Sequence, residues 1–136
     1  MKRILIAILI LALIGGAIAY RMWNKPHENI AETKSVATVT SSDLFKSYSA
    51  DEKSANEKYM AKVITVSGKV AESKVEEGKT VVTLQTEDPI GTVVCSLDPY
   101  SKQEKTSFAV GDQVSFKGIC NGFLSDVIVD RCVLVK

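Results

Sequence analysis

After Lys62 the chain changes to a period of two residues, and this alternation restricts the fold more than any other feature. In KVITVSGKVAES, residues 62–73, one set of alternate positions holds Val63, Thr65 and Ser67, and the other holds Ile64, Val66 and Gly68. Successive side chains of a β-strand point to opposite faces of a sheet. The pattern therefore predicts a strand that ends where the polar residues begin.

Four later segments have the same strand character: GKTVVTLQT at 78–86, GTVVCSL at 91–97, QVSFKGIC at 113–120 and DVIVDRCVLV at 126–135. Turn residues separate them, and residues 98–112 predict a short helical or irregular crossover. Gly68 and Gly118 are expected at bends. Five short strands with a connection between the third and the fourth match the small Greek-key barrel called the OB-fold.

The segment before these strands, residues 40–62, has helical spacing instead. Thr40 or Ser42 can cap a helix, and the apolar residues of one stripe are Leu44, Tyr48, Ala55 and Tyr59. We expect one amphipathic helix that breaks near Ala50 and docks on the sheet. The fold class is thus all-β with helical additions.

The N-terminus contains an uncharged apolar run from Ile4 to Tyr20, preceded by two basic residues. As a membrane anchor, the run lies at the short end of the usual range of about 17–25 residues. As a cleaved signal, it offers Ala17-Ile18-Ala19 before Tyr20. We favour the anchor, so the expected division is 1–22 anchor or signal segment, 23–39 juxtamembrane spacer and 40–136 OB-fold domain with its leading helix.

The charge of the chain argues against nucleic acid as the main ligand. Lys2 and Arg3 are the only charged residues before Arg21, so 15 of the 17 basic residues remain after it, against 16 acidic ones, a formal balance of −1. Proteins that hold nucleic acid through its phosphates normally carry a basic excess on one face. Nucleic acid is therefore a disfavoured partner.

Three segments together resemble a known family: ANEKYMAKVITVSGKV, VVCSLDP and VGDQVSFKGICNGFLSDVIVDRCVLVK. They are similar to the bacterial membrane-anchored proteins grouped as tRNA_anti-like, and the most specific pattern is KGxCxGFLxDVxxxxCxLxK at Lys117–Lys136. The resemblance implies an OB barrel behind an N-terminal apolar segment. It implies no particular ligand, because a shared fold does not carry function by itself.

The three cysteines, Cys95, Cys120 and Cys132, lie on three different expected strands. Zinc is not expected, because the chain has neither CxxC spacing nor a second histidine beside His27. Three arrangements stay open: a Cys120–Cys132 disulfide, a Cys95–Cys132 disulfide, or three buried thiols. Strand geometry makes the first demanding, since bridged Cα atoms lie within about 7 Å.

No catalytic motif is present in the sequence: there is no Gly-x-Ser-x-Gly elbow, no phosphate-binding glycine loop and no usable histidine. The acidic residues lie mostly at turns and do not follow a calcium-binding spacing. We therefore expect no enzyme activity, no catalytic residues, no metal and no cofactor.

Two functions stay open. The favoured one is a non-catalytic interaction module that is held by a single membrane pass outside the bacterial inner membrane, or is secreted after cleavage. It would bind a protein, a peptide or a small envelope ligand. The alternative is a binder of single-stranded nucleic acid of the tRNA-anticodon type, which needs stacking rings and cations. The candidate ligand-binding residues are Lys69, Lys117, Phe123 and Arg131, with Tyr100 and Phe116 as further aromatic candidates.

Overall fold

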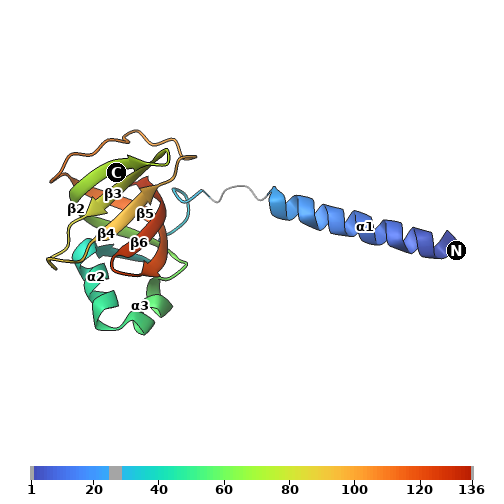
Figure 1. Cartoon of the computed structure of the whole chain (residues 1–136), viewed down its shortest axis with the longest axis horizontal. Helices are drawn as coiled ribbons and strands as arrows, with labels where there is room; N and C mark the ends of the chain where they lie inside the picture. Colours follow the sequence, from blue (N-terminus) through green and yellow to red (C-terminus); the bar gives the residue numbers. More distant parts are fainter. Residues whose placement is uncertain (1, 25–28, 136) are drawn as a thin grey trace.

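The computed structural model describes residues 2–24 and 29–135, which form one small barrel and a separate N-terminal helix (Figure 1). The elements in chain order are α1 (Lys2–Trp23), β1 (Ala37–Thr40), α2 (Ser41–Ala50), α3 (Glu52–Tyr59), β2 (Val63–Glu76), β3 (Lys79–Leu84), β4 (Val93–Leu97), β5 (Gln113–Phe123) and β6 (Val127–Leu134). The five strands expected from the alternation are β2 to β6, and all five are confirmed.

The barrel strands follow the order β2-β3-β4-β6-β5, and a further pairing between β2 and β5 closes the ring. All neighbours are antiparallel except β4 and β6, which run parallel. The first three strands form a meander, and residues 98–112 then cross to β5 without a regular helix. This is the topology of an OB-fold, a five-stranded Greek-key barrel.

Closure depends on the length of β2. Its first half pairs with β5 and its second half pairs with β3, and the register shifts between Val70 and Glu72 where the strand bends. On β5, Gly118 allows a close approach to β6, since a Cβ atom there would lie 2.7 Å from Cys132 Sγ and 2.8 Å from the Asp130 carbonyl oxygen. The expected role of Gly118 at a barrel corner is confirmed.

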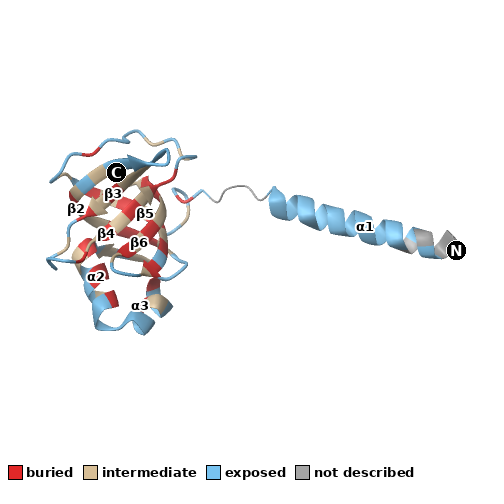
Figure 2. Ribbon diagram, in the orientation of Figure 1, coloured by how far each residue is buried: buried red, intermediate tan, exposed pale blue. Residues whose placement is uncertain are grey.

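Helices α2 and α3 pack against one end of the barrel, where their apolar stripe joins the barrel interior in a single core (Figure 2). Thr40 caps α2 and Asp51 caps α3, each by accepting a hydrogen bond from a backbone N–H in the first turn. The expected break near Ala50 is confirmed. Its cause is Asp51, whose extended backbone ends one helix and whose carboxylate caps the next.

The polar stretch before α2 is more ordered than its composition indicates. Residues 29–36, here called the strap, lie along the barrel, and β1 follows them as a short strand parallel to β2. Ile30 is only 1% exposed, and Val36 N–H donates to the Val63 carbonyl at 2.8 Å. The assignment of this whole stretch to a spacer is therefore corrected: a spacer without structure does not describe residues 29–40.

Helix α1 forms over the apolar run and extends away from the barrel, with its described side chains exposed (Figures 1 and 2). Among the residues that the structure describes, no helix reaches the length and apolar content required to cross a membrane. The membrane-spanning part of the expectation is therefore not confirmed.

Removal of the strap and β1 is expected to weaken the domain. A fragment that begins at Thr40 should unfold cooperatively, but its free energy of unfolding should be about 2–4 kcal/mol lower than that of a fragment beginning at Asn29, because Ile30 and part of β1 lose their burial. Denaturant titration of both fragments measures the difference.

Two substitutions in the longer fragment serve as controls. Ile30→Ala should reproduce most of the loss, whereas Lys34→Ala, at an exposed position of the strap, should stay within about 0.5 kcal/mol. Equal stability of the two fragments would contradict the structural role of the strap.

Candidate functional site

The largest cavity of the described chain lies beside the end of β6 and has a volume of about 560 Å³. We call it the β6 pocket, and its lining residues are Asn29, Ala31, Asp98, Tyr100, Ser101, Lys102, Gln103, Glu104, Val133 and Leu134. They come from the strap, from the connection between β4 and β5, and from β6. A volume of this size is in the range of small-ligand sites, about 300–1,000 Å³.

The Asp98-Pro99 dipeptide builds one wall of this pocket. Asp98 N–H still donates to the Cys132 carbonyl at 2.9 Å, but Pro99 has no N–H with which to continue the pairing. The Asp98 carboxylate then accepts from Tyr100 N–H at 3.0 Å, which turns the chain away from β6. Arg131 Nε lies 3.9 Å from the other oxygen of this carboxylate, which is largely buried. The pocket therefore begins where β4 leaves the sheet.

Gln103 returns to the sheet with its side chain rather than with its backbone. Its amide nitrogen donates to the Cys132 carbonyl at 2.9 Å, and its amide oxygen accepts from Leu134 N–H at 3.3 Å. The side-chain amide thus covers backbone groups of β6 that β4 no longer reaches.

Tyr100 differs from every other aromatic residue of the barrel domain, because its side chain is 77% exposed. The buried aromatic residues are Phe45, Tyr48, Tyr59, Phe108 and Phe116, and Phe123 is half-buried. Lys102 and Glu104, which also line the pocket, are exposed and of opposite charge. The pocket therefore offers one aromatic ring, an apolar floor and a mixed polar rim.

The four predicted ligand-binding residues have different surroundings. Lys117 Nζ donates to the Ala31 carbonyl at 3.0 Å and so holds the strap. Arg131 lies beside Asp98 at the pocket wall, and Lys69 is exposed on β2. Phe123 packs against α2, with its ring centroid 5.7 Å from that of Phe45. Their role in ligand binding stays a prediction.

The sequence analysis did not find Gln103, Lys102 or the strap as parts of a site. The signal that could have pointed to them is Asp98-Pro99, since a proline directly after a buried strand ends its pairing on that side. Phe116, the further aromatic candidate, is fully buried in the core and makes an edge-to-face contact with Phe108. Core packing accounts for it.

The outer face of β3 and β4, where an OB barrel commonly binds its ligand, has a plain chemistry here. Val81 pairs with Ser96 and Thr83 pairs with Val94 in the register of the two strands. All four residues are half-buried. Aliphatic and hydroxyl side chains at these positions provide neither a stacking ring nor a cation.

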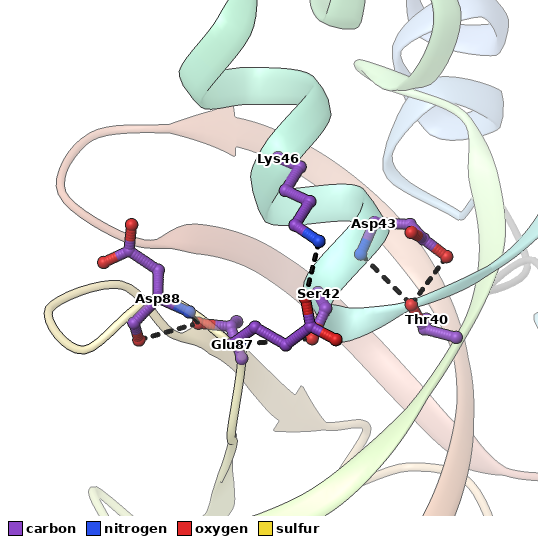
Figure 3. Close-up of polar contacts among 7 residues, drawn as sticks. Thr40, Ser42, Asp43, Lys46, Glu87 and Asp88 are labelled. Atoms are coloured by element: carbon purple, nitrogen blue, oxygen red, sulfur yellow. Dashed lines mark hydrogen bonds and ion pairs between the residues drawn. The ribbon is translucent and has the colours of Figure 1, made fainter.

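A second polar cluster joins the start of α2 to the connection between β3 and β4 (Figure 3). Glu87 N–H donates to Ser42 Oγ at 3.1 Å, and the Glu87 carboxylate pairs with Lys46. The hydrogen bond from Lys46 to Glu87 raises the pKa of the lysine above its usual value. Both side chains are exposed, so this ion pair adds little to stability. The cluster fixes the connection over the helix.

All three cysteines are free thiols and fully buried. Cys120 Sγ lies 3.3 Å from the Tyr48 hydroxyl oxygen, whereas Cys132 contacts the Val129 carbonyl and Cys95. Burial, with a hydrogen bond to Cys95, raises the pKa of Cys132 well above its ordinary value. The Cys120–Cys132 disulfide is not formed in this structure, and the surroundings favour Cys95 as the nearer partner of Cys132.

Within residues 2–24 and 29–135, no three His, Cys, Asp or Glu side chains come together as a group that could hold a metal ion. His27, which the sequence analysis judged a poor ligand, lies outside the described residues.

The closed barrel, its strand order and the helices at one end define the chain as an OB-fold protein. The family model of tRNA_anti-like proteins matches residues 1–134, and the chain belongs to this family. The resemblance drawn from the sequence is thus confirmed. A comparison with curated proteins finds no match.

A solved structure from Klebsiella pneumoniae subsp. pneumoniae MGH 78578 is similar in fold, with a TM-score of 0.61 and 11% sequence identity. The similarity covers 83% of this chain and 100% of the other, which is described as a "putative nucleic acid-binding lipoprotein". At this identity the likeness establishes the fold.

The contact between Lys117 and the strap gives a prediction. Lys117→Ala should lower the free energy of unfolding by about 1 kcal/mol, because the Ala31 carbonyl loses a charged donor. Hydrogen exchange at the Val36 amide should become faster, since that amide holds the strap to β2. Exchange mass spectrometry and denaturant titration measure the two effects. Lys69→Ala is the matched control, and an equal effect there would contradict the specific role of Lys117.

Proposed function

We propose that the barrel domain is a non-catalytic binding module that recognises a protein, a peptide or a small ligand through the β6 pocket. The observation that carries this proposal is the distribution of the aromatic rings. Apart from Tyr100 and the half-buried Phe123, every aromatic ring of the domain is packed in the core. A pocket with a single accessible ring suits one side chain or one small group better than a run of stacked bases.

The charge around the pocket supports the same proposal. Arg131 faces Asp98, Lys117 is engaged by the strap, and Lys102 lies near Glu104 among the lining residues. Cations with acidic or carbonyl partners beside them give a mixed field rather than a basic strip. A polynucleotide requires several cations along its backbone.

Binding of single-stranded nucleic acid is the second candidate function. Tyr100 and Lys102 lie in the same pocket and could stack one base and contact one phosphate. The description of the Klebsiella protein also names nucleic acid, which supports the candidate by analogy of fold alone. The sequence-derived candidates Lys69 and Arg131 would then extend the contact.

Site-directed crosslinking distinguishes the two functions. A photo-crosslinking residue in place of Lys102, introduced into the full-length protein in its native membranes, should give an adduct that proteinase removes and nuclease leaves intact. The matched control carries the same residue in place of Lys53 on α3, an exposed position away from the pocket, and should give little adduct. An adduct at position 102 that nuclease shortens would reverse the ranking of the two functions.

Attachment to the cell envelope is a separate part of the proposal. The described side chains of α1 are apolar from Ile4 to Ile18 except for the small residues, and they are exposed to solvent without protein cover. Exposure of this much apolar surface is unfavourable in water. We infer that α1 holds the domain at the bacterial inner membrane, with the barrel on the extracytoplasmic side, unless a peptidase removes it.

The fate of α1 can be measured directly. The protein should stay in the membrane pellet after carbonate washing, and its N-terminal residue should be Met1. Replacing Leu11 and Ile14 by Asp should release it to the soluble fraction, because charges in the apolar segment disfavour lipid contact. Tyr20 as the mature N-terminus would instead establish a cleaved signal.

A further inference from the structure

Backbone groups of β6 face an unfilled strand position beside the β6 pocket. Val133 pairs with Lys117 of β5, and Val135 N–H donates to the Ser115 carbonyl at 2.8 Å. Because the N–H and C=O groups of a strand alternate between its two sides, the groups of Cys132 and Leu134 point the other way, toward the line of β4.

Strand β4 does not reach these groups. It runs parallel to β6, and its last paired residue, Leu97, lies opposite Cys132. The Asp98-Pro99 turn then leads the chain away. The line of β4 beyond Asp98 is therefore an open edge of the sheet, and the β6 pocket lies along it.

The Gln103 side chain occupies this edge as a substitute for a strand. In a parallel pair, one residue donates to the carbonyl before its partner and accepts from the N–H after it. The Gln103 amide does the same around Val133, since it donates to the Cys132 carbonyl at 2.9 Å and accepts from Leu134 N–H at 3.3 Å. A side-chain amide has the same donor and acceptor as a peptide group.

We propose that the β6 pocket binds an extended peptide segment of a partner protein, which displaces the Gln103 amide and adds to β6 as a parallel strand continuing β4. This inference rests on the proposed function and specifies its ligand. Strand addition at an exposed sheet edge is a general mode of peptide recognition, in which main-chain hydrogen bonds give affinity and pockets read side chains.

The lining of the pocket specifies the segment further. Ala31, Val133 and Leu134 provide apolar surface, and the exposed Tyr100 ring lies on the same pocket. The segment should therefore carry an apolar or aromatic side chain beside the residue that takes the place of Gln103. That residue cannot be proline, because a proline lacks the N–H that must reach the Cys132 carbonyl.

Peptide selection on the full-length protein in detergent tests the proposal. A phage library of random linear 12-residue peptides should yield binders, and N-methylation of one central peptide nitrogen should abolish their binding. Hydrogen exchange measured by NMR should show slower exchange of the Leu134 amide in the complex, because a peptide carbonyl replaces the weaker Gln103 contact.

Substitution of Gln103 gives the second measurement. Gln103→Ala should bind the same peptides roughly five- to tenfold more tightly, because the competing side-chain bonds are gone. Gln103→Glu, which cannot donate to the Cys132 carbonyl, should also bind more tightly and serves if the alanine variant is unstable. Thr106→Ala, exposed in the same connection and outside the pocket, is the matched control and should not change the affinity.

The outcomes separate this inference from the proposed function. Peptides that bind without slowing exchange at Leu134, or with equal affinity for the Gln103 variants, would overturn strand addition and leave a peptide-binding module. A library without any enriched peptide would also overturn strand addition. The crosslinking at position 102 would then decide the wider function independently.

Discussion

The rest of this structure depends on the pairing of β2 with two partners. Because β2 (Val63–Glu76) bends and pairs first with β5 and then with β3, the sheet closes and leaves no edge within the ring. Closure satisfies the backbone hydrogen bonds and surrounds one apolar interior. It also explains why Gly118 is needed on β5: two strands and the Cys132 thiol meet there with no room for a side chain.

Closure leaves an open end, and α2 and α3 cover it with rings. Tyr48 lies between Tyr59 and Phe123, with ring centroids 6.2 and 5.8 Å away, and its pKa is raised by burial and by the hydrogen bond with Cys120. Aromatic residues bury large apolar areas, so a small domain that uses its rings in this way gains stability there. The same use removes those rings from the surface, which is why Tyr100 and the β6 edge carry the proposed binding.

Particular residues show how far the sequence could predict the structure. Alternation identified all five barrel strands, and the pattern from Lys117 to Lys136 identified the family, because both signals lie in local spacing. The strap was not predicted, since its buried Ile30 is one apolar residue in a polar stretch. Gln103 was not predicted either, because its two hydrogen bonds join it to residues 29 and 31 positions away in the chain.

The sequence alone determined the fold class, the helix pair before the barrel and the family, because period, capping residues and turn residues act between near neighbours. Tertiary structure decided where the cysteines lie, which cations hold the protein's own backbone and where the pocket opens. The Asp98-Pro99 turn shows the division well. The sequence states that pairing must stop at Pro99, but only the parallel packing of β4 on β6 makes the backbone of Cys132 and Leu134 the edge that is left open.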